Sequence, residues 1–299
     1  MNGGEPESTG DTMGRDTTGL PAPPGPEGTT MTVGRATRFV RSWPSGDGAV
    51  AAPLVIVHGF GEHSGRYDWL ARQLAATGRN VWSMDLAGHG RSPGSGTDVG
   101  GLDGVLDDIA ALIELAASTS GVAGAPVLYG HSMGGVLAAA FAATRSPALD
   151  ALILSAPAVH LALQTGARGA AVRFIGPVFP RVGIGRIDPS RLSRDAGAVA
   201  AFVADPLVWH GPVPAGTAWV MIQAGRRALA GAGQITSPVL ILHGTDDRIV
   251  PISASRALAA RLAAAETRVV ELPGVPHEPH HDLARDQLVA ILSEWLARH

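Results

Sequence analysis

Short apolar runs alternate with longer segments of helical spacing along most of this chain. A continuous apolar run is typical of a parallel strand that is buried on both faces. We expect such strands at residues 53–57, 80–84, 126–129, 151–154, 238–242 and 268–272. The intervening segments predict helices at 66–76, 102–118, 135–143, 253–264 and 282–297. This alternation predicts an α/β fold, with a mostly parallel sheet and helices on both faces.

The N-terminal part of the chain has a different pattern. Residues 1–30 contain mostly Gly, Glu, Thr, Asp and Pro and almost no aliphatic residues. Such a segment buries too little apolar surface to offset the entropy of ordering, so we expect it to be disordered. Residues 37–43 alternate between polar and apolar and predict an edge strand, paired with residues near Thr32.

The alternation also stops between residues 159 and 234, where no strand is evident. A structureless loop of that length is uncommon inside a compact domain, so we expect an inserted cap of short helices. The core is then made of residues 31–158 and 235–299. Arginines 168, 173 and 181 are interspersed among the apolar residues of the first half of the cap, which are Leu161, Leu163, Val172, Phe174, Ile175, Val178 and Phe179. These apolar residues either pack the cap onto the core or form an acyl-binding lid that contacts lipid interfaces.

Composition and charge exclude several classes of protein. The 299 residues suffice for one large α/β domain with an insertion. The net charge of −3, without a long basic run, argues against a nucleic-acid partner. The lack of cysteine excludes disulfides, thiolate catalysis and cysteine-based zinc sites. No signal-peptide pattern and no membrane-spanning run is present, so we expect a cytoplasmic protein, with peripheral membrane association through the cap as a further hypothesis.

The most informative motif is Gly-His-Ser-Met-Gly at residues 130–134. It lies between a predicted strand and a predicted helix, which is the context of a nucleophile elbow. The tight turn strains the serine backbone and requires small residues at Gly130 and Gly134. It exposes the Ser132 hydroxyl and directs the N–H of Met133 toward the position where an oxyanion would form. Ser132 is therefore the candidate nucleophile.

A serine hydroxyl needs a base and an acid that orients this base, and in this architecture they follow in the order Asp then His. Asp246 and Asp247 compete for the role of the acid in the turn after the strand at 238–242. Among the histidines after the last strand, His277 comes first and can reach Ser132, while His280 fits a position behind it or facing the substrate and His281 fits the exposed start of the final helix. A metal site is the alternative for three close histidines, but no carboxylate or cysteine cluster supports it, so we predict no metal.

The second oxyanion donor is expected on the loop after an early strand. His58-Gly-Phe-Gly-Glu62 follows the strand ending at Val57, so the N–H of Phe60 is the candidate. The flanking glycines allow the backbone to approach a substrate closely.

Several segments together resemble the monoacylglycerol lipase family of serine α/β-hydrolases. The resemblance runs from about residue 35 to the C-terminus, cap included, and its most specific parts are Gly61–Tyr67 and Ile187–Arg194. The other matching segments are His58–Phe60, Asp85–Ser92, Gly130–Gly135, Leu154–Pro157, Asp205–Leu207 and His243–Arg248. The resemblance implies an α/β-hydrolase fold with a helical cap, and hydrolysis of a monoacylglycerol to fatty acid and glycerol without a cofactor.

The resemblance also implies residue roles. Ser132 matches the nucleophile, Asp247 the acid and His277 the base, and the amides of Phe60 and Met133 match the oxyanion hole. The positions that shape the polar glycerol end of the pocket are matched by Glu62, Arg66, His131 and His280. An ion pair that only holds the loop is an equal interpretation of Glu62 and Arg66.

Two residues depart from the family pattern. Phe202 stands where the family often has a tyrosine that contacts the glycerol head, and losing that hydroxyl weakens the preference for glycerol. Pro276 replaces an aromatic residue just before the base. A general carboxylesterase or lysophospholipase therefore stays open as an alternative, and a non-catalytic binding protein of this fold is a third hypothesis.

Overall fold

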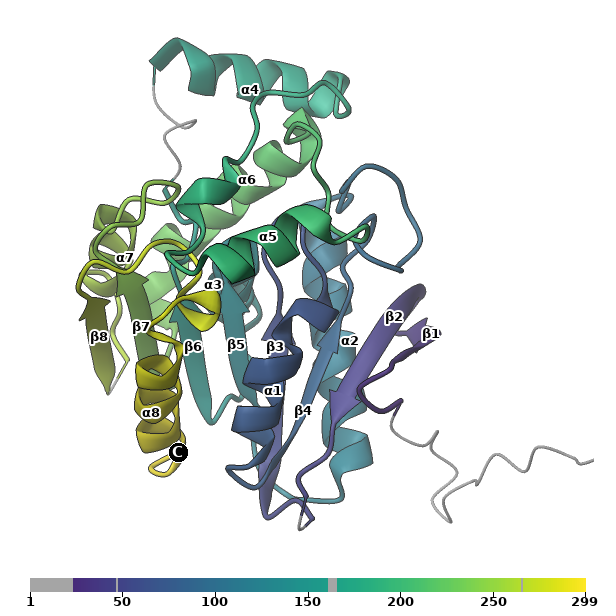
Figure 1. Cartoon of the computed structure of the whole chain (residues 1–299), viewed down its shortest axis with the longest axis vertical. Coiled ribbons are helices and arrows are strands. Elements are labelled where there is room, and N and C mark those ends of the chain that lie inside the picture. The colour runs from purple at the N-terminus through teal and green to yellow at the C-terminus, as the bar shows by residue number, and fades with distance from the viewer. Residues whose placement is uncertain (1–23, 47, 161–165, 265) are drawn as a thin grey trace, which may run out of the picture.

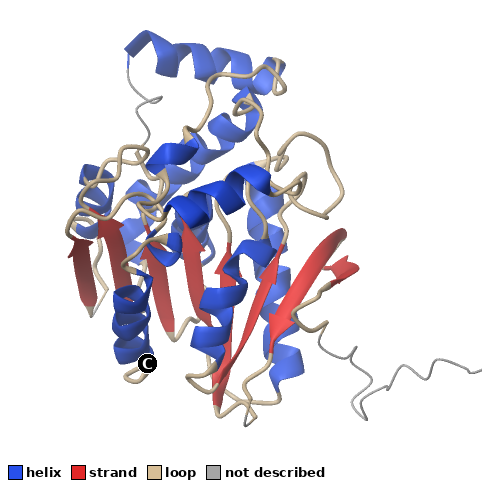
Figure 2. Cartoon of the chain, in the orientation of Figure 1, coloured by secondary structure: helices blue, strands red, loops and turns tan. Residues whose placement is uncertain are grey.

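The computed structural model describes residues 24–46, 48–160, 166–264 and 266–299. In this part of the chain, eight strands form one sheet in the order β1-β2-β4-β3-β5-β6-β7-β8, with helices on both faces (Figures 1 and 2). The strands are β1 Thr29–Val33, β2 Ala36–Trp43, β3 Ala51–Val57, β4 Arg79–Met84, β5 Val127–His131, β6 Ala151–Ser155, β7 Val239–Gly244 and β8 Thr267–Leu272. From β4 to β8 the pairs are parallel, while β2 is antiparallel to β1 and β4. The α/β-hydrolase fold is confirmed.

The central strands are apolar throughout because both of their faces are covered. In β3, Val55 and Val57 belong to the apolar cluster under α2 and α3, whereas Leu54 and Ile56 belong to the cluster under α1 and α8. All four are nearly inaccessible to solvent. A continuous apolar run rather than an alternating one is what burial on both faces requires.

The helices of the core lie close to the predicted segments, with differences at their ends. They are α1 Asp68–Ala75, α2 Leu102–Ser120, α3 Met133–Arg145, α7 Ser253–Ala259 and α8 Arg285–Leu296. The segment expected as a helix from residue 66 begins with a 3-10 turn, η1 Ser64–Tyr67. The last helix begins at Arg285 instead of residue 282, because the Asp282 carboxylate accepts hydrogen bonds from the N–H groups of Arg194 and Ala284 before the helix starts.

The N-terminal boundary of ordered structure differs from the expected one. Residues 1–23 of the segment predicted to be disordered lie outside the described residues. Residues 24–30 form a turn and the start of β1. The N–H of Gly25 donates to the Ser42 hydroxyl at 3.0 Å, and the carbonyl of Gly25 accepts from the N–H of Ser42 at 2.9 Å. Hydrogen bonds to β2 thus order a segment that has few apolar side chains. As predicted, Thr32 lies in a strand that pairs with the strand at 37–43, opposite Thr37.

The inserted region contains helices over the carboxyl ends of the strands (Figure 1). They are α4 Gly166–Val178, η3 Pro189–Arg191, α5 Ala196–Ala204, α6 Ala215–Gly231 and η4 Ala232–Gln234. Helix α6 packs against α3 and contributes Ala218, Met221 and Ile222 to the core cluster. The second half of the insertion is therefore built into the core, while α5 lies over the carboxyl ends of the strands and α4 packs on α6 (Figure 1).

Helix α4 and the residues after it divide their apolar side chains between core and solvent. Val172 is buried in the core cluster, whereas Phe174, Val178 and Phe179 are 78%, 66% and 61% exposed. Leu161 and Leu163 lie outside the described residues. Among the described helices, none is both long enough and apolar enough to cross a bilayer.

Candidate active site

Ser132 lies in the sharp turn between β5 and α3. Its backbone has φ 52° and ψ −113°, a conformation that a non-glycine residue adopts only under strain. A Cβ atom at Gly130 would collide with the backbone of Gly134, and one at Gly134 would collide with the carbonyl oxygens of Val57 and His58. The two glycines are therefore required by the turn, as the motif predicts.

The structure brings Ser132, His277 and Asp247 into one hydrogen-bonded row. Nε2 of His277 lies 2.8 Å from Oγ of Ser132, and Nδ1 of His277 lies 2.6 Å from Oδ2 of Asp247. The three residues are supplied by the turn after β5, the loop after β8 and the loop after β7. In this geometry the serine hydroxyl donates to His277, and His277 donates to the carboxylate.

Asp247, not Asp246, faces the base. Oδ1 of Asp247 accepts from the N–H groups of Ile249 and Val250 at 2.8 and 2.9 Å, and the side chain is fully buried. Burial alone would raise the pKa of this carboxyl, but His277 and the hydrogen bonds hold it well below its usual range. Asp246 forms a surface ion pair with Arg248, with a distance of 3.3 Å.

The loop that carries Phe60, the candidate oxyanion loop, is held by a buried hydrogen bond to Glu62 and by a backbone hydrogen bond to the cap. Phe60 lies between β3 and η1, and the N–H of the preceding Gly59 donates to Oε1 of Glu62 at 2.6 Å. The carbonyl of the following Gly61 accepts from the N–H of Trp209 in the cap at 2.7 Å. Met133 is the first residue of α3, where the backbone N–H has no acceptor within the helix.

The predicted glycerol-end residues lie next to the base. His131 packs against both His277 and His280, with ring centroids 5.0 and 4.7 Å apart. Arg66 pairs with Glu62 at 2.8 Å, and its guanidinium lies 4.7 Å from the ring centre of Phe202 on α5. All five predicted residues thus belong to one neighbourhood. The ion-pair interpretation of Glu62 and Arg66 also holds, because the two meet in a buried contact.

Two further neighbours of the candidate site were not predicted from the sequence. His243 contacts Asp247, with Nε2 3.1 Å from Oδ2. Glu278 is buried, and its two carboxylate oxygens accept from the two terminal nitrogens of Arg66 at 2.9 and 2.8 Å. The signal for His243 was its position four residues before Asp247 at a strand end. The signal for Glu278 was a charged residue directly after the base in an otherwise apolar or histidine-rich loop.

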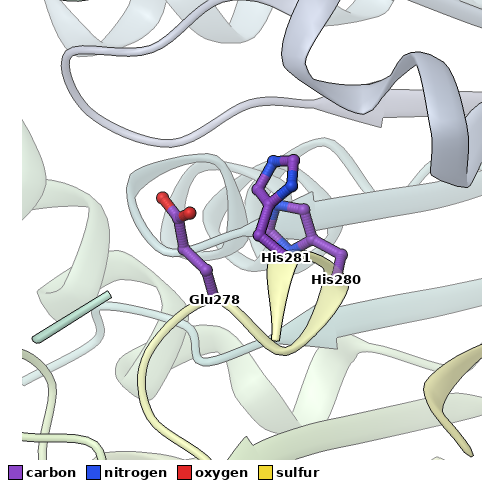
Figure 3. A group of neighbouring side chains, drawn as sticks. All are labelled: Glu278, His280 and His281. Carbon is purple, nitrogen blue, oxygen red and sulfur yellow. The ribbon is translucent and has the colours of Figure 1, made fainter. Parts of the chain in front are cut away.

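Glu278, His280 and His281 form the one group, within the described part of the chain, whose atoms are close enough to hold a metal (Figure 3). Their candidate ligand atoms lie within 4.8 Å of one another, and both ring nitrogens of His280 are buried without a hydrogen-bond partner. Both oxygens of Glu278, however, are held by Arg66, so a metal ion would compete with a cation for the only carboxylate of the group. We therefore interpret Glu278 as part of the Arg66 ion-pair network and not as a metal ligand.

A small cavity of about 210 Å³ separates the oxyanion loop from the cap. It is lined by Phe60, Arg186, Ile187, Pro189, Phe202, Trp209, His210 and Gly211. A larger groove of about 880 Å³ lies between the β1–β2 hairpin and α2, and none of the predicted site residues lines it. The smaller cavity is lined by two predicted site residues, Phe60 and Phe202, and is therefore the candidate binding space.

The sequence matches the family Hydrolase_4, described as serine aminopeptidase, S33, over residues 48–284. A monoacylglycerol lipase of Mycolicibacterium smegmatis is 34% identical over 247 residues, which cover 82% of this chain and 88% of that protein. The monoglyceride lipase of Homo sapiens is 31% identical over 249 residues, which cover 82% and 81% of the two chains.

Solved structures show the same likeness. The crystal structure of Paleococcus ferrophilus monoacylglycerol lipase has a TM-score of 0.79 and 30% identity, and the match covers 88% of this chain and 99% of that one. A soluble variant of the monoglyceride lipase from Saccharomyces cerevisiae, in complex with a substrate analog, has a TM-score of 0.81 at 21% identity, which supports the fold.

Proposed function

Because this chain belongs to the monoacylglycerol lipase family of serine α/β-hydrolases, we propose that it hydrolyses monoacylglycerols to a fatty acid and glycerol. The observation that carries the proposal is the row Ser132–His277–Asp247, with contacts of 2.8 and 2.6 Å beneath the cap. The wider family is described by a peptidase name. The relatives from Mycolicibacterium smegmatis, Homo sapiens and Paleococcus ferrophilus are named as lipases, which favours an ester substrate.

The proposed reaction has two halves. Ser132 attacks the ester carbonyl while His277 takes the hydroxyl proton, and Asp247 stabilises the imidazolium that forms. The tetrahedral intermediate expels the alcohol as His277 returns the proton, which leaves an acyl-enzyme. A water molecule, deprotonated by His277, then releases the fatty acid.

Backbone amides stabilise the charge that develops on the carbonyl oxygen. We assign this role to the N–H groups of Phe60 and Met133, on the loop after β3 and at the start of α3. Removing one such donor typically costs about 3–4 kcal/mol of barrier stabilisation. The hydrogen bond from Gly59 to Glu62 supports this role, because it fixes the peptide next to the Phe60 amide.

The polar group beside the base supports glycerol as the alcohol. Glu62 and Arg66 place charged groups near His277. His280 adds two ring nitrogens that have no hydrogen-bond partner within the described residues. Phe202 supplies no hydroxyl at this end. That one difference favours a second candidate function, a carboxylesterase or lysophospholipase with a broader choice of alcohol.

The proposed lipid substrate also gives the exposed side chains of the cap a role. Phe174, Val178 and Phe179 lie on or directly after α4 with the exposed arginines 173 and 181 nearby, a combination suited to the surface of a lipid bilayer. We propose that the cap contacts membranes peripherally and takes its substrate from them.

A substrate panel with one acyl chain tests the proposed specificity. The panel compares the monoacylglycerol, the lysophospholipid and the methyl ester, each presented in the same detergent. The proposal expects the highest kcat/KM for the monoacylglycerol. A higher value for either of the other esters would assign the second candidate function.

A further inference from the structure

Glu278, Arg66 and Glu62 form a buried network of two carboxylates and one guanidinium. Nη1 of Arg66 donates to both acids, to Oε1 of Glu278 at 2.9 Å and to Oε2 of Glu62 at 2.8 Å, while Nη2 donates to Oε2 of Glu278 at 2.8 Å. The side chains of Glu278, Arg66 and Glu62 are 6%, 7% and 2% exposed. Two buried carboxylates therefore share one guanidinium, that of Arg66, and all three groups are almost inaccessible to water.

All three groups are charged at neutral pH. Burial alone would raise the pKa of Glu278, but the Arg66 guanidinium lowers it to about 2. Burial alone would also raise the pKa of Glu62, but the attraction of Arg66, together with other neighbouring groups, lowers it. The two carboxylates raise the pKa of Arg66 against the effect of burial. The network thus carries one net negative charge.

The neighbouring imidazoles do not neutralise this charge. Burial lowers the pKa of His131 to about 4 and the pKa of His280 well below its usual range, so both rings are neutral at physiological pH. The ring of Phe202 lies over Arg66 and is itself 8% exposed, which keeps water from screening the network. The charge is therefore felt by the nearest group that gains a proton during the reaction, His277.

We propose that Glu278 is a positioning residue that acts through His277, because its carboxylate leaves a net negative charge beside the base and favours the imidazolium formed when Ser132 attacks. This inference rests on the proposed serine-hydrolase function, but not on the identity of the ester. Asp247 orients the ring by direct contact. Glu278 acts on His277 through its charge, because both of its carboxylate oxygens are hydrogen-bonded to Arg66.

The charge of Glu278 should affect the pKa of His277 and therefore the pH dependence of Ser132 reactivity. Asp247 and Ser132 contact the two ring nitrogens of His277, and His131 packs against its ring. The other titratable groups that act on His277 are Glu62, from the loop after β3, and Glu278 and His280, from its own loop. Burial lowers the pKa of His277, but Asp247, Glu278 and Glu62 together raise it above its usual value. His277 must be neutral to accept a proton, so reactivity is lost as the pH falls through this pKa. Removing one negative charge therefore moves the acid limb to lower pH.

The test is the pH dependence of Ser132 inactivation by a fluorophosphonate. This reagent reports the ionisation of His277 in the free enzyme, whatever ester the enzyme prefers. Glu278→Gln keeps the shape of the side chain and removes its charge. We expect its acid limb to move down by roughly half to one pH unit, and its plateau rate to fall roughly three- to tenfold. Should this variant not fold, Glu278→Ala carries the same expectation.

One control variant separates charge from shape. Glu278→Asp keeps the charge but shortens the side chain. It should have an acid limb near that of the wild type. An unmoved limb in Glu278→Gln, or an equal shift in all variants, would overturn the inference. A wild-type protein that the reagent does not label would overturn the proposed function as well.

Discussion

His243 lies 3.1 Å from Asp247, measured from Nε2 to Oδ2, the same carboxylate oxygen that contacts His277 at 2.6 Å. Nε2 of His243 also lies 2.9 Å from the carbonyl oxygen of Val250, and Nδ1 lies 2.7 Å from the Ser255 hydroxyl. Since both neighbours of Nε2 are acceptors, this nitrogen carries a hydrogen, and His243 donates to the carboxylate. Asp247, the proposed catalytic acid, is thus oriented by a second, fully buried histidine.

Replacing His243 with leucine should loosen Asp247 and, through it, His277. We expect kcat to fall about tenfold with little change in KM, because the alignment of the base changes while the substrate pocket does not. Steady-state kinetics on a monoacylglycerol measures both constants. Ser255→Ala removes only the hydrogen bond at Nδ1 of His243 and should give a smaller loss. A folded His243→Leu enzyme with wild-type kcat would show that this contact has no role in catalysis.

Adding the hydroxyl that Phe202 lacks should sharpen the choice of alcohol. Phe202 lies on α5, with the Arg66 guanidinium over its ring and the small cavity beside it. We expect Phe202→Tyr to raise the ratio of kcat/KM for a monoacylglycerol to that for the methyl ester of the same acid by roughly three- to tenfold, about the value of one new hydrogen bond. Phe202→Leu is the matched control and should not raise this ratio. A ratio that falls in the tyrosine variant would place the glycerol elsewhere.

The exposed aromatic residues of the cap should govern binding to lipid. Replacing Phe174 and Phe179 with serine removes apolar surface that is 78% and 61% exposed in the protein. We expect the double variant to bind neutral phosphatidylcholine vesicles about tenfold less tightly, in a sedimentation assay. Val50→Ser is the matched control, since Val50 is 79% exposed just before β3 and distant from the cap. Equal binding by all three proteins would mean that the cap makes no lipid contact.

Much of the fold was predictable because the strongest signals were local. The runs at 53–57 and 238–242 are wholly apolar, and the structure buries both as central strands. The elbow was predictable because only glycine fits at positions 130 and 134. The segment at 24–30 was not, because its order comes from hydrogen bonds to β2 and not from its own side chains.

The parts of the site that escaped prediction depend on distant contacts. Arg66 and Glu278 are 212 residues apart in the sequence, and nothing in either segment indicates that they meet. The cap was equally hard to predict, because the apolar pattern of α4 does not distinguish the buried Val172 from the exposed Phe174. Periodicity identifies an apolar face, but the partner of that face is decided by the tertiary arrangement.

Measuring the glycerol and fatty acid released from a monoacylglycerol by the wild type and by Ser132→Ala shows most directly whether Ser132 is the nucleophile of a monoacylglycerol hydrolase. We expect equal molar amounts of both products from the wild type and a rate at least about a thousandfold lower from the variant. A correctly folded Ser132→Ala protein that hydrolyses the monoacylglycerol at the wild-type rate would mean that another group is the nucleophile.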